Sequence, residues 1–192
     1  MALSDSRRIS LIALLTAIAI LLNQIVRIPA PFDQYLLYEF WEIPILLGFL
    51  LLGFWSGTTI AFLNTLYLFL LPQPVLLGPV YNLLAVISMV VGVLAAMRVA
   101  RSRGWGSSGL WISATALGSL SRTLVMTLVN AAVVTQPPPI GYSIPSDVLL
   151  ETLLFTGVFN LTVTLYTVPL AFSALRAVRS RYRFPQPGEL AR

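Results

Sequence analysis

The most constraining feature of this sequence is an apolar stretch, Ile43–Met97, that contains no charged residue. A helix needs ~20 apolar residues, at ~1.5 Å each, to cross the ~30 Å hydrocarbon core of a bilayer. Turn-forming residues interrupt the stretch twice, once over 53–57 and again over 72–79. The stretch therefore predicts three consecutive membrane spans, two of them short.

The composition supports a protein that is embedded in a membrane. Hydrophobic residues make up 57% of the chain, charged residues only 10%, and the mean hydropathy is +0.86. Soluble domains carry roughly 25% charged residues, which cover their surface. This chain has too little charge for that, so a soluble enzyme, a disordered tail and a domain that binds nucleic acid are excluded.

Three further apolar stretches bring the predicted number of spans to six. We expect helices, because a membrane barrel would show strands of about ten residues with alternating polarity. The predicted fold class is therefore all-α, an integral membrane bundle of six transmembrane helices in a single domain over 1–192. The spans are expected at about 9–27, 39–53, 57–71, 79–98, 110–134 and 147–175.

The arginines predict the orientation. Cytoplasmic loops of membrane proteins are rich in Lys and Arg. Three clusters fit this rule: Arg7 and Arg8; Arg98, Arg101 and Arg103; Arg176, Arg179, Arg181 and Arg183. Six spans bring all three to the same side, which predicts a multi-pass protein of the cell membrane with both termini cytoplasmic. The outer loops are then 27–38, 72–78 and 135–146.

Several polar residues fall inside the predicted spans. Placing a polar group at this depth of the bilayer costs free energy, so such residues usually face the bundle interior. From the helical rise, Glu42, Asn82, Asn130 and Glu151 lie near the outer face, whereas Arg122 and Asn160 lie roughly 18–20 Å deep. This arrangement suits an outward-facing pocket for a polar, flat or hydroxylated molecule. Alternatively, each Asn hydrogen-bonds a neighbouring helix, and the Glu residues are simply interfacial.

Two further residues of this region, Trp41 and Arg122, each have alternative roles. Trp41 belongs to the interfacial aromatic belt or stacks on a ligand. For Arg122 we expect a hydrogen-bonded or partner-facing role rather than an ion pair, because Glu39, Glu42 and Glu151 are all predicted to lie closer to the outer face. How these three carboxylates pair is left open.

The residue types that most catalytic and metal sites require are missing. The chain contains no His, no Cys and no Lys, so the common zinc, haem and thiolate sites and the lysine-containing phosphate loop are excluded. We therefore expect no catalytic residue, no metal, no cofactor and no ATPase activity. The alternative of an intramembrane enzyme would need a nucleophile with its base or a metal.

Several short motifs occur in a specific order along the chain. Span 1 carries small residues four apart on one helix face, a pattern that lets another helix approach closely. Together the motifs resemble those of the substrate-binding S components of energy-coupling factor (ECF) vitamin transporters, with the riboflavin branch most similar. They are Ala13-xxx-Ala17, Glu39-Phe-Trp-Glu-Ile-Pro44, Gly53-Phe-Trp-Ser-Gly57, Gly78-Pro-Val-Tyr-Asn82, Asn130 and Phe159-Asn160.

The resemblance, which covers about residues 8–176, implies a function and partners. The chain would bind a vitamin with high affinity and deliver it by ATP-driven uptake. By the resemblance, Asn82, Asn130 and Asn160 would line the pocket. The positions of Glu42, Trp41 and Arg122 in the predicted spans make these three further candidates. Ala13 and Ala17 would dock on a transmembrane coupling subunit, the T component, that works with two ABC-type ATPase subunits. Membrane lipid would surround the bundle.

One departure from the riboflavin pattern bears on the substrate. The family places a Lys three residues after the Asn of span 6, where this chain has Val163. Either Arg122 compensates, or the substrate is another water-soluble vitamin or precursor such as pantothenate or pyridoxine. A small self-sufficient secondary transporter is a further alternative, although no inverted repeat, the usual sign of one, is visible.

Overall fold

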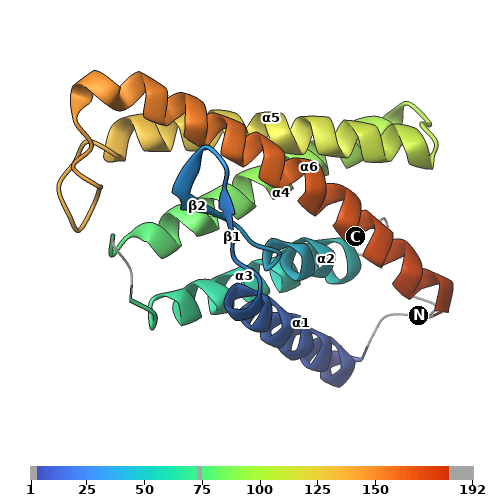
Figure 1. Cartoon of the computed structure of the whole chain (residues 1–192). Helices are drawn as coiled ribbons and strands as arrows, with labels where there is room; N and C mark the ends of the chain where they lie inside the picture. The colour runs from blue at the N-terminus through green and yellow to red at the C-terminus, as the bar shows by residue number, and fades with distance from the viewer. Residues whose placement is uncertain (1–3, 73–74, 182–192) are drawn as a thin grey trace.

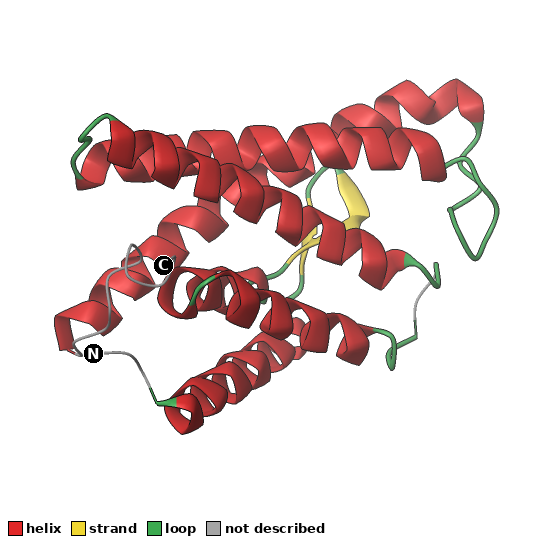
Figure 2. Cartoon of the chain, turned by 180° about the vertical axis from the view of Figure 1, so that it is seen from behind, coloured by secondary structure: helices red, strands yellow, loops and turns green. Residues whose placement is uncertain are grey.

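The computed structural model describes residues 4–72 and 75–181, and these form a bundle of six α-helices with one small hairpin (Figures 1 and 2). The all-α prediction is confirmed. The helices are α1 Asp5–Ile25, α2 Glu42–Leu52, α3 Phe54–Leu68, α4 Gly78–Ser102, α5 Ser107–Val133 and α6 Leu149–Arg181, which follows the short 3-10 helix η1 Ser146–Val148.

Helix α2 forms the centre of the bundle. All of its residues except Ile43 are buried, and it packs against α1, α3, α4 and α6. A helix that is hydrophobic all round is stable only when neighbours surround it. The uncharged character of this stretch therefore reflects burial in protein, whereas α1 exposes several leucines and isoleucines on its surface.

The connection between α2 and α3 is a single residue, Gly53. Its φ angle of 87° lies in the left-handed region, which glycine adopts without steric cost. Helix α3 therefore folds back beside α2, with Ser56 in its first turn accepting a hydrogen bond from Arg8 of α1 (2.8 Å). This contact places the α2–α3 turn next to the start of α1.

The predicted loop 27–38 contains structure that the sequence did not reveal. Strands β1 Ile28–Ala30 and β2 Asp33–Tyr38 pair antiparallel, with Ile28 opposite Tyr38 and an irregularity after Pro29. They are the only strands in the part of the chain that the structure describes. The hairpin lies between α1 and α6, beside the central helix (Figure 1).

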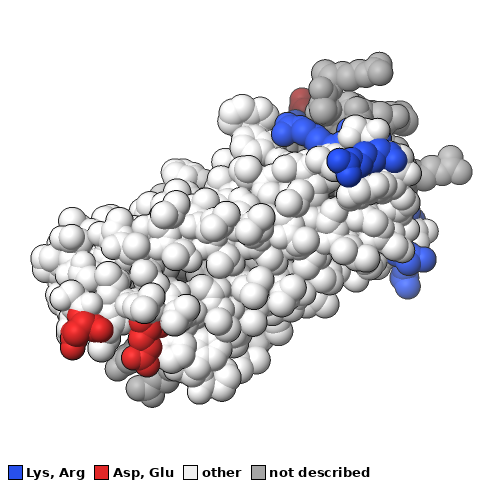
Figure 3. All heavy atoms as spheres, turned by 90° about the horizontal axis from the view of Figure 1, so that it is seen from above, with Lys and Arg blue, Asp and Glu red and all other residues white. Residues whose placement is uncertain are grey.

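The ends of the bundle differ in charge and in connections. The start of α1, the α4–α5 turn and the end of α6 lie at one end of the molecule (Figure 1). On the face seen in Figure 3, arginines gather at one end, acidic residues occur mainly at the other, and the surface between them is uncharged. Arg183 and part of the predicted loop 72–78 lie outside the described residues.

Four helices, α1, α4, α5 and α6, are long and apolar enough to cross a membrane. Helix α2, with 11 residues, covers about 16 Å, and α3, with 15, about 22 Å, both less than the ~30 Å of a bilayer core. The residues that precede α2 fill the remaining depth, because the hairpin reaches far down α6. This short central helix therefore determines how deep in the bundle its first residue, Glu42, lies.

Candidate functional site

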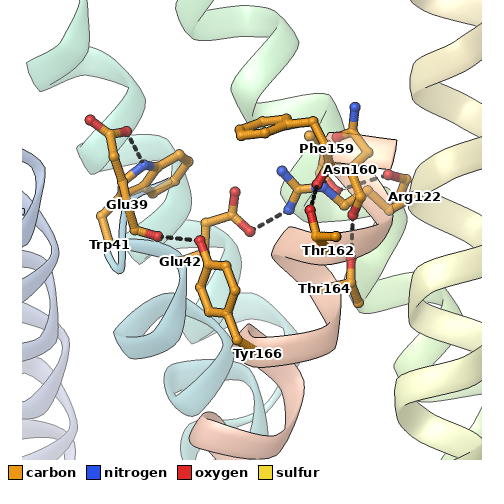
Figure 4. Close-up of polar contacts among 11 residues, drawn as sticks. Glu39, Trp41, Glu42, Arg122, Phe159, Asn160, Thr162, Thr164 and Tyr166 are labelled. Atoms are coloured by element: carbon orange, nitrogen blue, oxygen red, sulfur yellow. Dashed lines mark hydrogen bonds and ion pairs between the residues drawn. The ribbon is translucent and has the colours of Figure 1, made fainter. Parts of the chain in front are cut away.

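A buried charged cluster connects three helices at the centre of the bundle (Figure 4). Glu42 opens α2, Arg122 lies in the middle of α5 and Asn160 in the first half of α6. The guanidinium of Arg122 forms an ion pair with Glu42 through Nη1, and its Nε donates to Asn160 Oδ1 at 2.9 Å. All three residues are at most 5% exposed. Burying a charged pair at this depth costs free energy, and this cost marks the cluster as the candidate site.

The ion pair corrects the expectation for Arg122. We expected no carboxylate at its depth, because the predicted span placed Glu42 near the outer face. Helix α2 instead begins deep in the bundle, since residues 28–41 occupy the space above it. The hydroxyl of Tyr166, which donates to Glu39 O at 2.7 Å, lies about 25 Å along α6 from Leu149.

Asn160 is held in place from two sides. Its amide Nδ2 donates to the carbonyl of Thr156 at 2.8 Å, while the hydroxyl of Thr164 donates to its backbone carbonyl at 3.1 Å. With Nδ2 used within its own helix, Oδ1 is the atom directed at Arg122. Asn160 therefore fixes the guanidinium by a second contact besides Glu42.

The hairpin packs on a single stripe of α6 through aromatic rings. Phe32 stacks on Phe155 with ring centroids 5.7 Å apart, Tyr38 contacts Phe159 at 5.1 Å, and Phe40 meets Tyr166 edge-on at 5.4 Å.

Tyr38 also shares a 2.8 Å hydrogen bond with Thr162. The α6 partners, at 155, 159, 162 and 166, lie on one helix face. The hairpin therefore covers the α6 side of the charged cluster. The helical spacing of residues 155, 159, 162 and 166 is visible in the sequence, but it was not recognised there as a packing face.

Trp41 and Glu39 form a second polar group at the foot of the hairpin. The Trp41 ring is 5% exposed, and its Nε1 donates to Glu39 Oε2 at 2.8 Å. Glu39 Oε1 lies 3.5 Å from Arg27 Nε, and Arg27 also donates to the carbonyl of Asn23. This group ties the hairpin to the end of α1 and accounts for the position of Glu39.

Asn82 and Asn130 do not join the charged cluster in this structure. Asn82 is exposed and Asn130 half-buried, near the end of the bundle that is opposite the α4–α5 turn. Each continues an inward-facing stripe of its helix, because Asn82 is four residues before the buried Val86 and Asn130 is four after the buried Met126. Asn130 and Arg122 thus share one face of α5, which leads from the bundle end to the cluster.

Other predicted residues are placed as follows. Val163 is 3% exposed and packed inside the bundle, where it offers no polar atom. Ala13 and Ala17 are exposed on α1. Within residues 4–72 and 75–181 no three His, Cys, Asp or Glu side chains are grouped as metal ligands.

The fold and the buried charged cluster together define a polytopic helical membrane protein with a polar centre. The chain belongs to the family of ECF transporter substrate-specific components, whose sequence model matches residues 7–176. Among curated protein sequences, no significant match is found.

A solved structure supports the fold. It is the S component of a bacterial ECF transporter, and it superposes with a TM-score of 0.70 over 92% of this chain and 98% of that chain. At 22% sequence identity this similarity shows the shared fold.

Proposed function

We propose that this substrate-specific component binds riboflavin and delivers it to the cell by ATP-driven uptake. The observation that carries the proposal is the Arg122–Asn160–Glu42 cluster beside the aromatic stripe of α6. Amide and guanidinium groups match the donors and acceptors on the edge of a flavin ring. Aromatic rings such as Phe159 and Tyr38 provide surfaces on which a flat ring stacks.

The first experiment is an absorbance spectrum of the detergent-purified protein, with mass spectrometry of the extracted ligand. A yellow protein that releases riboflavin would support the proposal and show that Val163 is compatible with flavin binding. A different bound vitamin would overturn the riboflavin assignment while leaving the family intact. For a colourless protein, titration against a panel of water-soluble vitamins decides, and failure to bind riboflavin contradicts the proposal.

Asn130→Ala is expected to weaken riboflavin binding at least tenfold. The substitution leaves a polar group of the ligand without its partner, and a tenfold loss corresponds to about 1.4 kcal/mol, within the usual cost of such a group. Stability is expected to be unchanged, because Asn130 is half-buried and no side-chain hydrogen bond to described residues involves it. Quenching of flavin fluorescence measures the affinity. Leu128→Ala, at a 71% exposed position two residues away, is the control.

Unchanged affinity in Asn130→Ala would remove this residue from the proposed pocket. An equal loss in Leu128→Ala would show that the helix end is merely sensitive to substitution. In either case the assignment of Asn130 to the ligand would fail, whereas a role for the deeper cluster would be tested separately.

We infer that Ala13 and Ala17 form the docking face for a coupling subunit. Both are exposed on α1, and small residues four apart let a second helix approach closely. Ala17→Trp is expected to reduce uptake at least tenfold in cells that also express the coupling module, with riboflavin affinity in detergent unchanged. Val91→Trp, at a 53% exposed position of α4, should retain uptake. Full uptake by Ala17→Trp would contradict the docking role.

We also infer that the arginine-rich end of the bundle faces the cytoplasm, so that both termini are cytoplasmic. The support is the arginine clusters and the positive-inside rule. The chain has no cysteine, so single cysteines at Ser107 and Ser143 serve as reporters. A membrane-impermeant thiol reagent added to intact cells should label the second and not the first. The reverse pattern would contradict this orientation.

A further inference from the structure

A groove runs along the outer surface of the bundle between α5 and α6. The two helices lie together near their connection and diverge toward the arginine-rich end (Figure 1). The hollow between them measures about 670 Å³. It is lined on α5 by small side chains that include Thr115, Ala116 and Ser119, and on α6 by Leu161, Leu165 and Pro169.

The surface of the groove is almost entirely carbon. The hydroxyl of Thr115 donates to the carbonyl of Trp111 at 2.9 Å, and the hydroxyl oxygens of Ser119 and Thr123 are buried beneath neighbouring atoms. Two of the lining side chains, Ile112 and Leu165, are 71% and 50% exposed. An occupant of this groove is therefore apolar along its length.

The groove is separate from the candidate vitamin site. Arg122, on the same helix, is 3% exposed and directed to the bundle interior. None of the predicted ligand-binding residues lines the groove, and neither do Ala13 and Ala17 of the predicted docking face.

The groove continues into a second hollow at the start of α5. This hollow is lined by Trp105, Gly106, Gly109, Ile112 and Ser113, and Ile112 lines both. Along α5, residues 109, 112, 116, 119 and 123 follow one another at intervals of three or four, so they lie on one face. The two hollows thus adjoin each other at Ile112 along α5, and together they are called the channel.

The end of the channel carries positive charge. Arg103 lies with its Cζ 5.6 Å from the centre of the Trp105 ring. The first turn of α5 has no side-chain cap, so its backbone N–H groups are free at the positive end of a 27-residue helix. Free N–H groups at a helix start together with an arginine are a suitable partner for a phosphate group.

The length of the apolar groove matches one leaflet of a membrane. From Ile112 to Thr123 the groove extends about 16 Å along α5, and half of the ~30 Å hydrocarbon core is about 15 Å. The channel's charged mouth and apolar body are arranged in the same order as the headgroup and acyl chain of a lipid.

We propose that the channel between α5 and α6 binds an anionic phospholipid of the leaflet at the arginine-rich end. One acyl chain lies in the groove over Ala116, and the phosphate contacts Arg103 and the N–H groups of the first turn of α5. The charged mouth favours this occupant over a second copy of the chain, whose apolar helix would leave the arginine unpaired.

Native mass spectrometry of the detergent-purified protein with added dioleoyl phosphatidylglycerol or dioleoyl phosphatidylcholine tests the proposal. The wild-type protein should retain one phosphatidylglycerol at least tenfold more tightly than phosphatidylcholine. Ala116→Phe, which fills the groove at an exposed position, should abolish this tight adduct. Arg103→Gln should remove the preference for phosphatidylglycerol while leaving the weak binding of both lipids.

Two control variants carry the same changes outside the channel. Ala177→Phe, on the exposed surface of α6, and Arg7→Gln, at the start of α1, should behave as the wild type. Equal retention of both lipids by the wild type would overturn the proposal, as would an equal loss in the controls. A dimer that disappears in Ala116→Phe would assign the groove to a second copy instead. Ala116→Leu, a smaller change, should weaken the adduct if Ala116→Phe fails to fold.

The lipid site is independent of the riboflavin proposal, because the two ligands contact different faces of α5. Flavin titration of Ala116→Phe distinguishes them: its riboflavin affinity should equal that of the wild type. A variant that loses lipid but keeps the vitamin site supports two separate sites. Loss of both ligands in Ala116→Phe, with both retained in Ala177→Phe, would contradict the separation.

Discussion

Glu42→Gln is expected to lower the free energy of unfolding by about 3–5 kcal/mol, which is the usual cost of leaving one member of a buried ion pair uncompensated. Arg122 is 3% exposed, so solvent cannot replace the lost carboxylate. The hydrogen bond to Asn160 remains, but an amide oxygen supplies only part of the missing negative charge. The midpoint of denaturation in detergent measures the effect.

The double variant Glu42→Leu with Arg122→Met separates stability from function. Replacing a buried ion pair by apolar side chains of similar size is often neutral or stabilising, so this variant should be about as stable as the wild type. Its riboflavin affinity should nevertheless fall at least tenfold, because the polar centre is gone. Unchanged affinity would mean that the pair is purely structural.

A matched control for Glu42 is available on α6. Glu151→Gln removes a carboxylate that is exposed, so stability should change by less than about 0.5 kcal/mol. If Glu42→Gln were as mild as Glu151→Gln, the ion pair would contribute little to the stability of the bundle.

Gly92→Leu is expected to prevent the protein from folding into a monodisperse bundle. A Cβ atom at Gly92 would lie 2.2 Å from the carbonyl oxygen of Leu117 and 2.8 Å from Cα of Gly118. These are backbone atoms of α5, so no side-chain rotation relieves the clash, and α4 and α5 must separate. Overpacking of this kind costs about 1–3 kcal/mol for small additions and more for large ones.

The consequences of Gly92→Leu reach the candidate site. Ser121 donates to the carbonyl of Ser88 at 2.7 Å across the same α4–α5 contact, and Arg122 is the next residue. Separation of the helices would therefore draw Arg122 away from Glu42. Size-exclusion chromatography in detergent and flavin binding measure the two effects.

Gly157→Ala is the control for Gly92. The new Cβ atom would have only the Thr127 hydroxyl nearby, at 3.9 Å. Because glycine inside a helix costs about 0.5–1 kcal/mol relative to alanine, stability should be equal or slightly higher. If Gly92→Leu also folded normally, the close approach of α4 and α5 would not be required for the bundle.

The sequence by itself determined the class and the general plan of the protein. Apolar stretches of helical length predicted an all-α membrane bundle, because backbone polar groups in lipid must be satisfied within helices or a closed barrel. The inward stripe of α5 was also predictable, since Arg122 is too costly to face lipid. Each of these conclusions depends on local composition and on the bilayer as a solvent.

Only the tertiary structure decided the depth at which the chain segments meet. The helical rise gives positions along one helix, and it assumes that each span begins at the membrane surface. Helix α2 does not, because the β1–β2 hairpin descends beside α6 and places Glu42 level with Arg122. The ion pair, the aromatic contacts of the hairpin and the groove between α5 and α6 all depend on contacts between segments far apart in the chain, and no local pattern determines such contacts.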